Sequence, residues 1–169
     1  MPLTQVQGAM VGPTGFANLS GITFPATQVP SADANTLDDY EEGTWTPGIT
    51  NATSYSTRLA RYTKIGNLVY AYCNVQCVFN TAGSTAQLIT GLPFTVESVS
   101  NDLYPLGNLF QVVGWNQSPM LTAIQGTPNS TTCTLYLISA STGTNYQNVT
   151  SNTFGTTVVF EMSIVYRAA

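Results

Sequence analysis

The stretch NLVYAYCNVQCVF, residues 67–79, decides the fold class because its apolar side chains recur at every second position. A period of two places successive side chains on opposite faces of a β-strand. The second face of this stretch carries Tyr70 and Tyr72 and then turns polar. The positions of the apolar face are Val69, Ala71, Cys73, Val75, Cys77 and Phe79. The pattern predicts a long strand with one face in a hydrophobic core.

The same alternation returns near the C-terminus, in TTVVFEMSIVYR at residues 156–167. Shorter β-prone runs, separated by Gly, Pro, Asn and Ser turn signals, occupy 86–90, 109–115 and 132–139. No amphipathic helix longer than two turns is visible in the pattern. Many short strands at this spacing are typical of antiparallel β-sandwiches and jelly rolls. We therefore expect an all-β domain, an antiparallel β-sandwich or jelly roll, over residues 44–169.

Residues 1–32 differ from the rest of the chain because they contain no charged residue and follow neither period. Glycine and proline recur every few positions, so this segment cannot build a core of its own. Its scattered apolar side chains nevertheless favour burial; they are Leu3, Val6, Met10, Phe16, Leu19, Ile22 and Phe24. We expect an extended N-terminal arm that packs against a partner protein through these anchoring residues.

The segment DANTLDDYEEG, residues 33–43, joins the arm to the predicted domain and concentrates acidic side chains. Thr36 and Asp39 have the spacing of a capping box, and Gly43 is a typical helix stop. We expect an acidic hinge or a short helix of one or two turns. An acidic turn without a helix is the alternative.

Charged residues are scarce along the whole chain, which has a net charge of −4 and only 7% Asp, Glu, Lys and Arg. Ordinary domains contain roughly 25%. A freely soluble monomer normally needs more charge, so the scarcity indicates a surface covered by other subunits. Tyr70 and Tyr72 are the interface candidates, since tyrosine combines apolar area with a polar tip. We expect a homo-oligomer; a secreted domain with a threonine-rich face is the alternative.

Several partners and locations are disfavoured by the sequence. No basic stripe occurs, which argues against nucleic acid and against an anionic membrane surface. No apolar run approaches the ~20 residues of a membrane-spanning helix. The N-terminus, Met1-Pro2-Leu3, lacks the charged and apolar regions of a signal peptide. We therefore expect the protein to be made in the cytoplasm.

The residues required for common catalytic chemistry are missing or scattered. Histidine is absent, which removes the usual nucleophile systems and the commonest metal ligand. Three cysteines without histidine make no zinc site, and we expect them to be buried free thiols. The carboxylates outside the acidic segment are Glu97, Asp102 and Glu161, and nothing in the sequence brings them together. We expect Glu161 to face Arg58, Arg61 or Arg167 across the sheet, and we expect no enzymatic activity, metal or cofactor.

Sugar binding without catalysis is a second functional hypothesis. Trp115, Asn116 and Tyr146 lie in stretches where aromatic rings stand beside amides. Aromatic faces stack on sugar rings and amides donate hydrogen bonds to them. Amides and hydroxyls are abundant throughout the chain, however, so composition alone also explains these clusters.

Three strings resemble a module that recurs in phage fibre and virion structural proteins. They are ITFPATQVPSADANTLDDYEEGTWTP (22–47), RYTKIGNLVYAYCNVQ (61–76) and ITGLPFT (89–95). LDDYEEGTWTP and RYTKIGN are the most specific of these motifs. The strings cover less than half of the chain, and the remainder contains no motif that matches the module.

The resemblance implies a homotrimer without catalytic activity, located in the virion. Because almost nothing precedes the module here except the arm, we expect a short head fibre, a capsid decoration protein or a short tail fibre. The arm would attach it to other virion proteins of the capsid or tail. The alternative is a receptor-binding tail fibre tip that recognises host surface carbohydrate, and a secreted adhesion domain is a more distant possibility.

Overall fold

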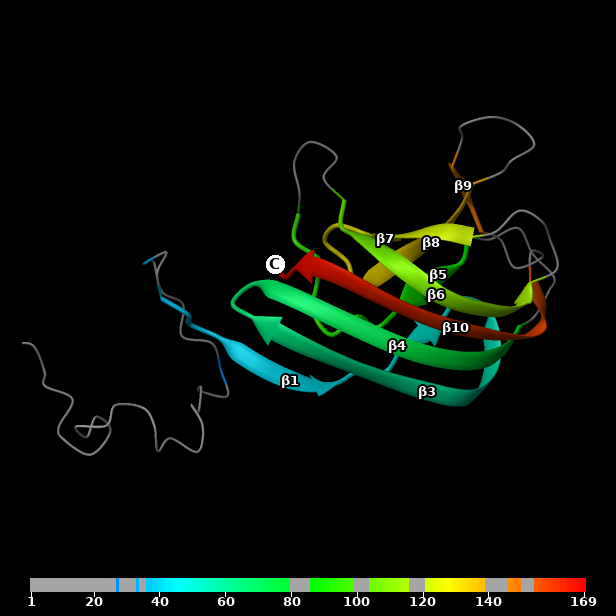
Figure 1. Cartoon of the computed structure of the whole chain (residues 1–169), viewed down its shortest axis with the longest axis horizontal. Helices are drawn as coiled ribbons and strands as arrows, with labels where there is room; N and C mark the ends of the chain where they lie inside the picture. The colour runs from blue at the N-terminus through cyan, green and yellow to red at the C-terminus, as the bar shows by residue number, and fades with distance from the viewer. Residues whose placement is uncertain are drawn as a thin grey trace, which may run out of the picture.

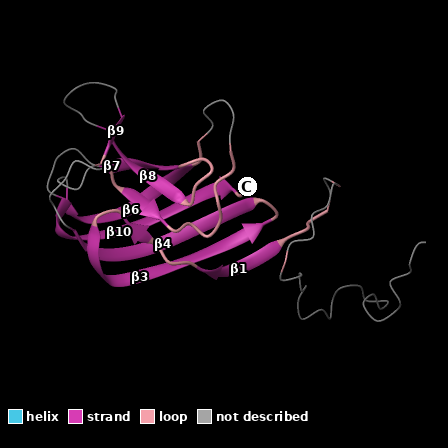
Figure 2. Cartoon of the chain, turned by 180° about the vertical axis from the view of Figure 1, so that it is seen from behind, coloured by secondary structure: helices cyan, strands magenta, loops and turns pink. Residues whose placement is uncertain are grey.

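The computed structural model describes residues 27, 33, 36–79, 86–98, 104–115, 121–138, 146–149 and 154–169. These residues form an all-β fold without a helix, as predicted (Figures 1 and 2). The strands are β1 (Tyr40–Thr44), β2 (Gly48–Ile49), β3 (Ala52–Ile65), β4 (Leu68–Phe79), β5 (Leu88–Thr90), β6 (Leu106–Trp115), β7 (Leu121–Gly126), β8 (Thr132–Ile138), β9 (Tyr146–Asn148) and β10 (Phe154–Arg167).

The ten strands belong to one antiparallel sheet that curls back on itself. Its order is β1-β3-β4-β10-β6-β7-β8-β5-β2, and β9 pairs with β8. β1 and β2 stand at opposite ends of this order, yet residues 45–47 alone connect them. The sheet must therefore bend until its two ends approach each other. In Figure 1, β3, β4 and β10 form a long lower layer, and β7 and β8 lie above it.

The core lies between these layers and consists of the predicted inward faces. All six apolar positions of β4 are buried, as the period of two predicted. The last strand supplies a matching row, with Val158 paired to Cys77 and Phe160 paired to Val75. The rings of Phe79 and Phe160 meet edge to face, with centroids 6.1 Å apart. The long central pair β4–β10 thus joins the two segments in which the sequence pattern is clearest.

The acidic segment is the place where the structure differs most from expectation. The prediction of a short helix in 33–43 is wrong for residues 40–43, because they lie in strand β1. β1 pairs with β3 from Tyr40 opposite Ile65 to Thr44 opposite Arg61. Local capping signals favoured a helix, but side chains of β3 supply partners that a helix would not reach. The sheet consequently begins four residues before the expected boundary at Thr44.

Two ends of the domain can be defined from the strand registers. At the proximal end, Tyr40 lies opposite Ile65, Ile65 opposite Leu68, and Leu68 opposite Arg167. At the distal end, Phe154 pairs with Trp115. The chain enters β1 at the proximal end. The predicted arm, residues 1–32, lies outside the described residues apart from Thr27.

Candidate functional site

Seven exposed apolar side chains lie on the solvent side of strands β3, β4, β10 and β6, among polar ones, and together are called the apolar face. Tyr70 lies opposite Val165, and Leu68 lies opposite Ile65, so these exposed apolar side chains stand beside one another across neighbouring strands. The members of this apolar face are Ile65, Leu68, Tyr70, Leu106, Phe110, Val113 and Val165, which are between 47% and 67% exposed. Exposed apolar groups gathered in this way are typical of protein–protein contact surfaces.

The two tyrosines predicted for a subunit interface have different environments. Tyr70 is 47% exposed and belongs to the apolar face. Tyr72 is half-buried, and its hydroxyl donates a 2.5 Å hydrogen bond to Glu161 Oε1. That hydrogen bond, with burial and the carboxylate charge, raises the pKa of Tyr72. Their role at an interface remains a prediction.

Glu161 does not have the partner expected from the sequence. We expected a base across the sheet, but the register places Glu161 between Asn74 on β4 and Gln111 on β6. Its carboxylate accepts the hydrogen bond from Tyr72 instead. The solvent side of the central strands therefore contains an acid held by a neutral hydroxyl.

Strand β6 contains a β-bulge at Phe110. Leu109 pairs with Met162 and Gln111 pairs with Glu161, so Phe110 is an extra residue between two successive pairs. A bulge of this kind redirects the side chain of the inserted residue. Phe110 is 64% exposed, whereas its neighbour Leu109 packs against the core. The sequence run 109–115, apolar at most positions, contains no sign of where the insertion falls.

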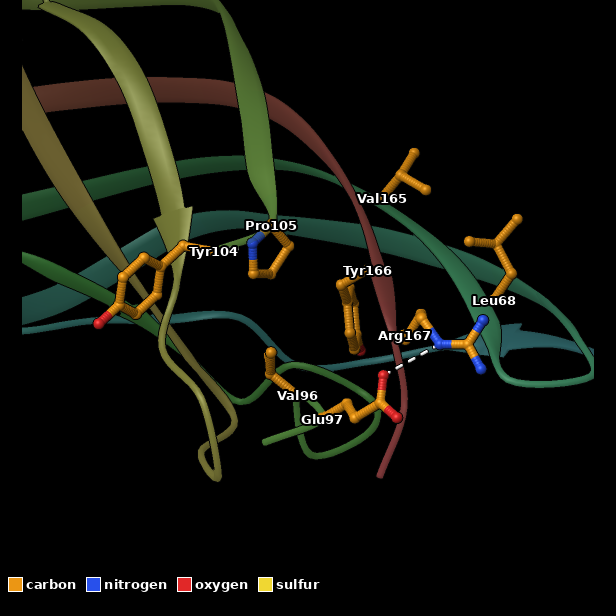
Figure 3. Close-up of a pocket in the computed structure, with 8 residues that line it drawn as sticks. All are labelled: Leu68, Val96, Glu97, Tyr104, Pro105, Val165, Tyr166 and Arg167. Atoms are coloured by element: carbon orange, nitrogen blue, oxygen red, sulfur yellow. Dashed lines mark hydrogen bonds and ion pairs between the residues drawn. The ribbon is translucent and has the colours of Figure 1, made fainter. Parts of the chain in front are cut away.

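A groove of about 330 Å³ opens at the proximal end beside the apolar face. Tyr104 and Pro105 form one side, and Leu68 lies on the other, as Figure 3 shows. Val96, Val165 and Tyr166 complete the apolar part of the lining, and Glu97 with Arg167 supplies the charged part. Arg167 Nε donates to Glu97 Oε2 over 3.0 Å. The groove leaves no signal in the sequence, because its sides come from four separate segments.

A second cluster fastens β1 to β3 and is called the β1–β3 joint. Lys64 forms a buried ion pair with Asp39, and its ammonium lies 5.2 Å from the centre of the Phe94 ring. The Tyr62 hydroxyl donates a 2.7 Å hydrogen bond to Glu41 Oε1, which is the main cause that raises the pKa of Tyr62 to about 12.

The joint brings together all three strings of the resemblance. Asp39, Glu41 and Gly43 belong to LDDYEEGTWTP, and Tyr62 and Lys64 belong to RYTKIGN. Phe94 comes from ITGLPFT and meets Tyr62 edge to face, with ring centroids 5.3 Å apart. Gly43 lies under the ring of Tyr62, where an added Cβ would come within 2.7 Å of that ring. The motifs therefore have a structural reason to occur together.

The remaining predicted site residues do not gather into a described site. The seven anchoring residues of the arm and Asn116 lie outside the described residues. Trp115 ends β6 and Tyr146 begins β9, where it pairs with Ile138 at the end of β8. Both positions lie toward the distal end, but their side chains are not described. Sugar binding by these residues remains a prediction.

The cysteines are buried free thiols, as expected. Burial raises the pKa of the thiols of Cys73 and Cys77 to about 12 and also raises the pKa of Cys133. A thiol that stays protonated near neutral pH is a poor nucleophile. Among the residues that the structure describes, no group of three Cys, Asp or Glu side chains is placed to hold a metal ion.

Within the same described residues, no helix is long and apolar enough to cross a membrane. Comparisons of the chain with protein-family models, with curated proteins and with solved structures found no match.

Proposed function

We propose that the chain is a non-enzymatic structural protein of a bacteriophage particle, a homotrimeric short fibre or decoration protein. Its N-terminal arm attaches it to the capsid or tail. The single observation that supports this proposal most strongly is the apolar face across β3, β4, β10 and β6. Such a face is costly to leave in water and is expected to be covered by another protein surface.

The distribution of charge supports coverage by further copies of the chain. Only 7% of the residues are charged, so few ionic groups oppose association. Beside the apolar face, Glu161 accepts a hydrogen bond from Tyr72 and Arg167 pairs with Glu97. The Arg167–Glu97 pair neutralises its own charges, which lowers the electrostatic cost of covering that part of the surface.

The β1–β3 joint supports attachment through the segment that precedes β1. Six of the chain's twelve charged residues lie on this strand pair or directly before it: Asp39, Glu41, Glu42, Arg58, Arg61 and Lys64. A force on the arm would enter the domain at Asp39, which the buried ion pair holds to β3. A fixed exit point suits a protein that is tethered by an uncharged arm.

In this proposal, the arm lies along a groove of the particle and gives up its freedom for apolar contacts and main-chain hydrogen bonds. Three arms on one trimer bind far more tightly than one, because the second and third contacts become intramolecular. The trimer thus converts a weak extended contact into stable attachment.

The direct experiment removes residues 1–32 and compares attachment with assembly. Particles lacking the protein are incubated with the full chain or with residues 33–169, and bound protein is measured after sedimentation. We expect the truncated chain to remain a folded trimer by light scattering and to lose attachment. Full occupancy by the truncated chain would refute the anchoring role of the arm.

A receptor-binding function is the second candidate, because Trp115 and Tyr146 lie toward the end of the domain opposite the start of β1. In a protein tethered through residues before β1, that end faces away from the particle. Glycan-array binding that disappears in both Trp115→Ala and Tyr146→Ala would favour this function. An array without any bound glycan would count against it.

A further inference from the structure

Strand β1 is the first strand of the domain that follows the arm. It stands at one end of the sheet order, and among the described strands it pairs with β3. It begins at the proximal end, beside the last residues of β3, and runs toward the distal end (Figure 1). β3 continues beyond it to the distal end, where Ala52 lies opposite Phe79. Because the rest of the domain extends distally from the start of β1, tension on the arm pulls along the axis of this strand.

Tension in that direction strains all the backbone pairs of β1 with β3 together. The hydrogen bonds of an antiparallel ladder lie perpendicular to the strands, so one strand cannot slide past the other without breaking them at the same time. The ladder covers all of β1, and Gly66 N–H donates a further 2.8 Å hydrogen bond to the carbonyl of Asp39. Beyond the other end of β1, Trp45 Nε1 donates to the carbonyl of Arg61 over 3.2 Å. A pull directed away from β3 would instead open these contacts one after another.

Two side-chain contacts of the β1–β3 joint add to the ladder. Lys64 forms the buried ion pair with Asp39, and the Tyr62 hydroxyl donates its 2.7 Å hydrogen bond to Glu41. Hydrogen bonds to an ionised group are stronger than those between neutral groups. Sliding of β1 would separate both carboxylates from their partners and leave the Lys64 ammonium buried without a counter-charge, which is costly. The joint therefore resists sliding more than its short ladder alone would.

Phe94 connects the joint to the central strands. Its ring meets the ring of Tyr62 with centroids 5.3 Å apart, and the Lys64 ammonium lies 5.2 Å from its centre. The backbone of Phe94 is held in turn by Tyr166 of β10. The Tyr166 hydroxyl accepts a 3.2 Å hydrogen bond from Phe94 N–H and donates a 3.1 Å hydrogen bond to its carbonyl. Tension that reaches β3 is thus shared with β10 as well as with the neighbouring strand β4.

We propose that the β1–β3 joint is a load-bearing mechanical clamp. Tension on the N-terminal arm shears β1 against β3, and Phe94 passes part of this load to the central strand β10. This inference rests on the arm attachment of the proposed function, which supplies the tension. The resistance to shear is a property of one subunit and does not depend on how many copies assemble.

Single-molecule pulling on the full chain tests the direction of loading. One handle is attached before Met1 in every case, and the second is attached to a cysteine introduced at one of two exposed positions, Ser54→Cys or Asn67→Cys. The three native cysteines are buried, and the unmodified chain is the control for labelling. Ser54 lies on the distal part of β3, so this pair of handles shears β1. Asn67 follows the proximal end of β3, so this pair opens the ladder from Asp39 onward.

We expect the first rupture at a clearly higher force with the Ser54→Cys handle than with the Asn67→Cys handle, because forced opening depends on how many contacts break in one step. The strand pair and the arm are the same in both measurements, and only the held end of β3 differs. Equal rupture forces in the two geometries would overturn the clamp.

A matched pair of variants then tests which contacts bear the load. Tyr62→Phe removes the hydrogen bond to Glu41 and keeps the ring beside Phe94. Tyr72→Phe removes a comparable hydrogen bond to Glu161, which joins β4 to β10 away from the joint. With the Ser54→Cys handle, we expect a lower rupture force for Tyr62→Phe and an unchanged force for Tyr72→Phe. Equal decreases in both variants would mean that the joint does not bear the load.

These results are distinguishable from a failure of the proposed function. Equal forces in the two geometries would refute the clamp and leave attachment through the arm intact. Full attachment of a chain that lacks residues 1–32 would refute the arm attachment, and with it the load on the clamp, although the forces in the two geometries would still differ.

Discussion

The β1–β3 joint and the apolar face lie on the same layer of the sheet but differ in whether their side chains find partners within the subunit. In the joint, the polar groups of Asp39, Lys64, Glu41 and Tyr62 find partners within the subunit. On the apolar face, Tyr70 and Val165 remain about half exposed. The contrast indicates that the polar groups of the β1–β3 joint are satisfied within the subunit. The apolar face, by comparison, leaves exposed side chains that another copy can cover.

The largest expected effect comes from Asp39→Ala, which removes the partner of the buried Lys64 ammonium. A buried charge that loses its partner typically costs about 3–5 kcal/mol. We expect a decrease of that size in the free energy of unfolding, measured by urea denaturation at one fixed protein concentration. A loss below about 1 kcal/mol would mean that Lys64 reaches solvent or another acid.

Gly43→Ala should have a smaller effect on the same joint. The new Cβ would come within 2.7 Å of the Tyr62 ring, so the ring must move away from Glu41 and Phe94. Overpacking of this kind typically costs about 1–3 kcal/mol. Gly66→Ala is not a matched control because its φ of +55° introduces backbone strain. The double variant Gly43→Ala with Tyr62→Ala should regain part of the loss relative to Tyr62→Ala alone.

Alkaline pH should weaken the joint through Tyr62. Its folded-state pKa is raised from 10.0 to about 12, mainly by the hydrogen bond to Glu41. The folded state therefore holds its proton more tightly than the unfolded state, so this stabilisation is complete below pH 10 and is lost as the pH rises toward 12. Urea denaturation between pH 9 and 12 should show a shallower decline for Tyr62→Phe than for the unmodified chain. Equal slopes would contradict this role of Tyr62.

The exposed ion pair of the groove should contribute least to the free energy of unfolding. The Glu97 and Arg167 side chains are 38% and 62% exposed, in contrast to 5% and 7% for Asp39 and Lys64. Exposed pairs typically contribute about 0.2–1 kcal/mol because water and salt screen them. We expect Glu97→Gln to change the free energy of unfolding by no more than that. A loss comparable to that of Asp39→Ala would remove the distinction between the two pairs.

Sequence reasoning was most successful where the period of two extends over many residues. The inward faces of β4 and β10 follow directly from alternation, and the buried thiols of Cys73 and Cys77 follow with them. It failed at β1, where YEEGT has little strand propensity and local capping signals point to a helix. The strand forms because Tyr62 and Lys64 on β3 provide partners for Glu41 and Asp39.

The candidate site could be predicted only in part. Tyr70 was found because it lies on the outward side of a clear alternation, but the same argument did not distinguish it from Tyr72. The difference depends on Glu161, which is 89 positions away along the chain. Phe110 and the groove were missed because a bulge and a junction of four segments leave no local signal.

The sequence by itself determined that this chain is an all-β protein, which positions of its long strands face the core, and that its surface carries few charges. Alternation is a local property, since neighbouring side chains of a strand must point in opposite directions. The tertiary structure alone decided which acid meets which base, where β6 inserts an extra residue, and that the ends of β4 and β10 border a groove. These features depend on the register between strands that are distant in sequence, and only the folded sheet specifies that register.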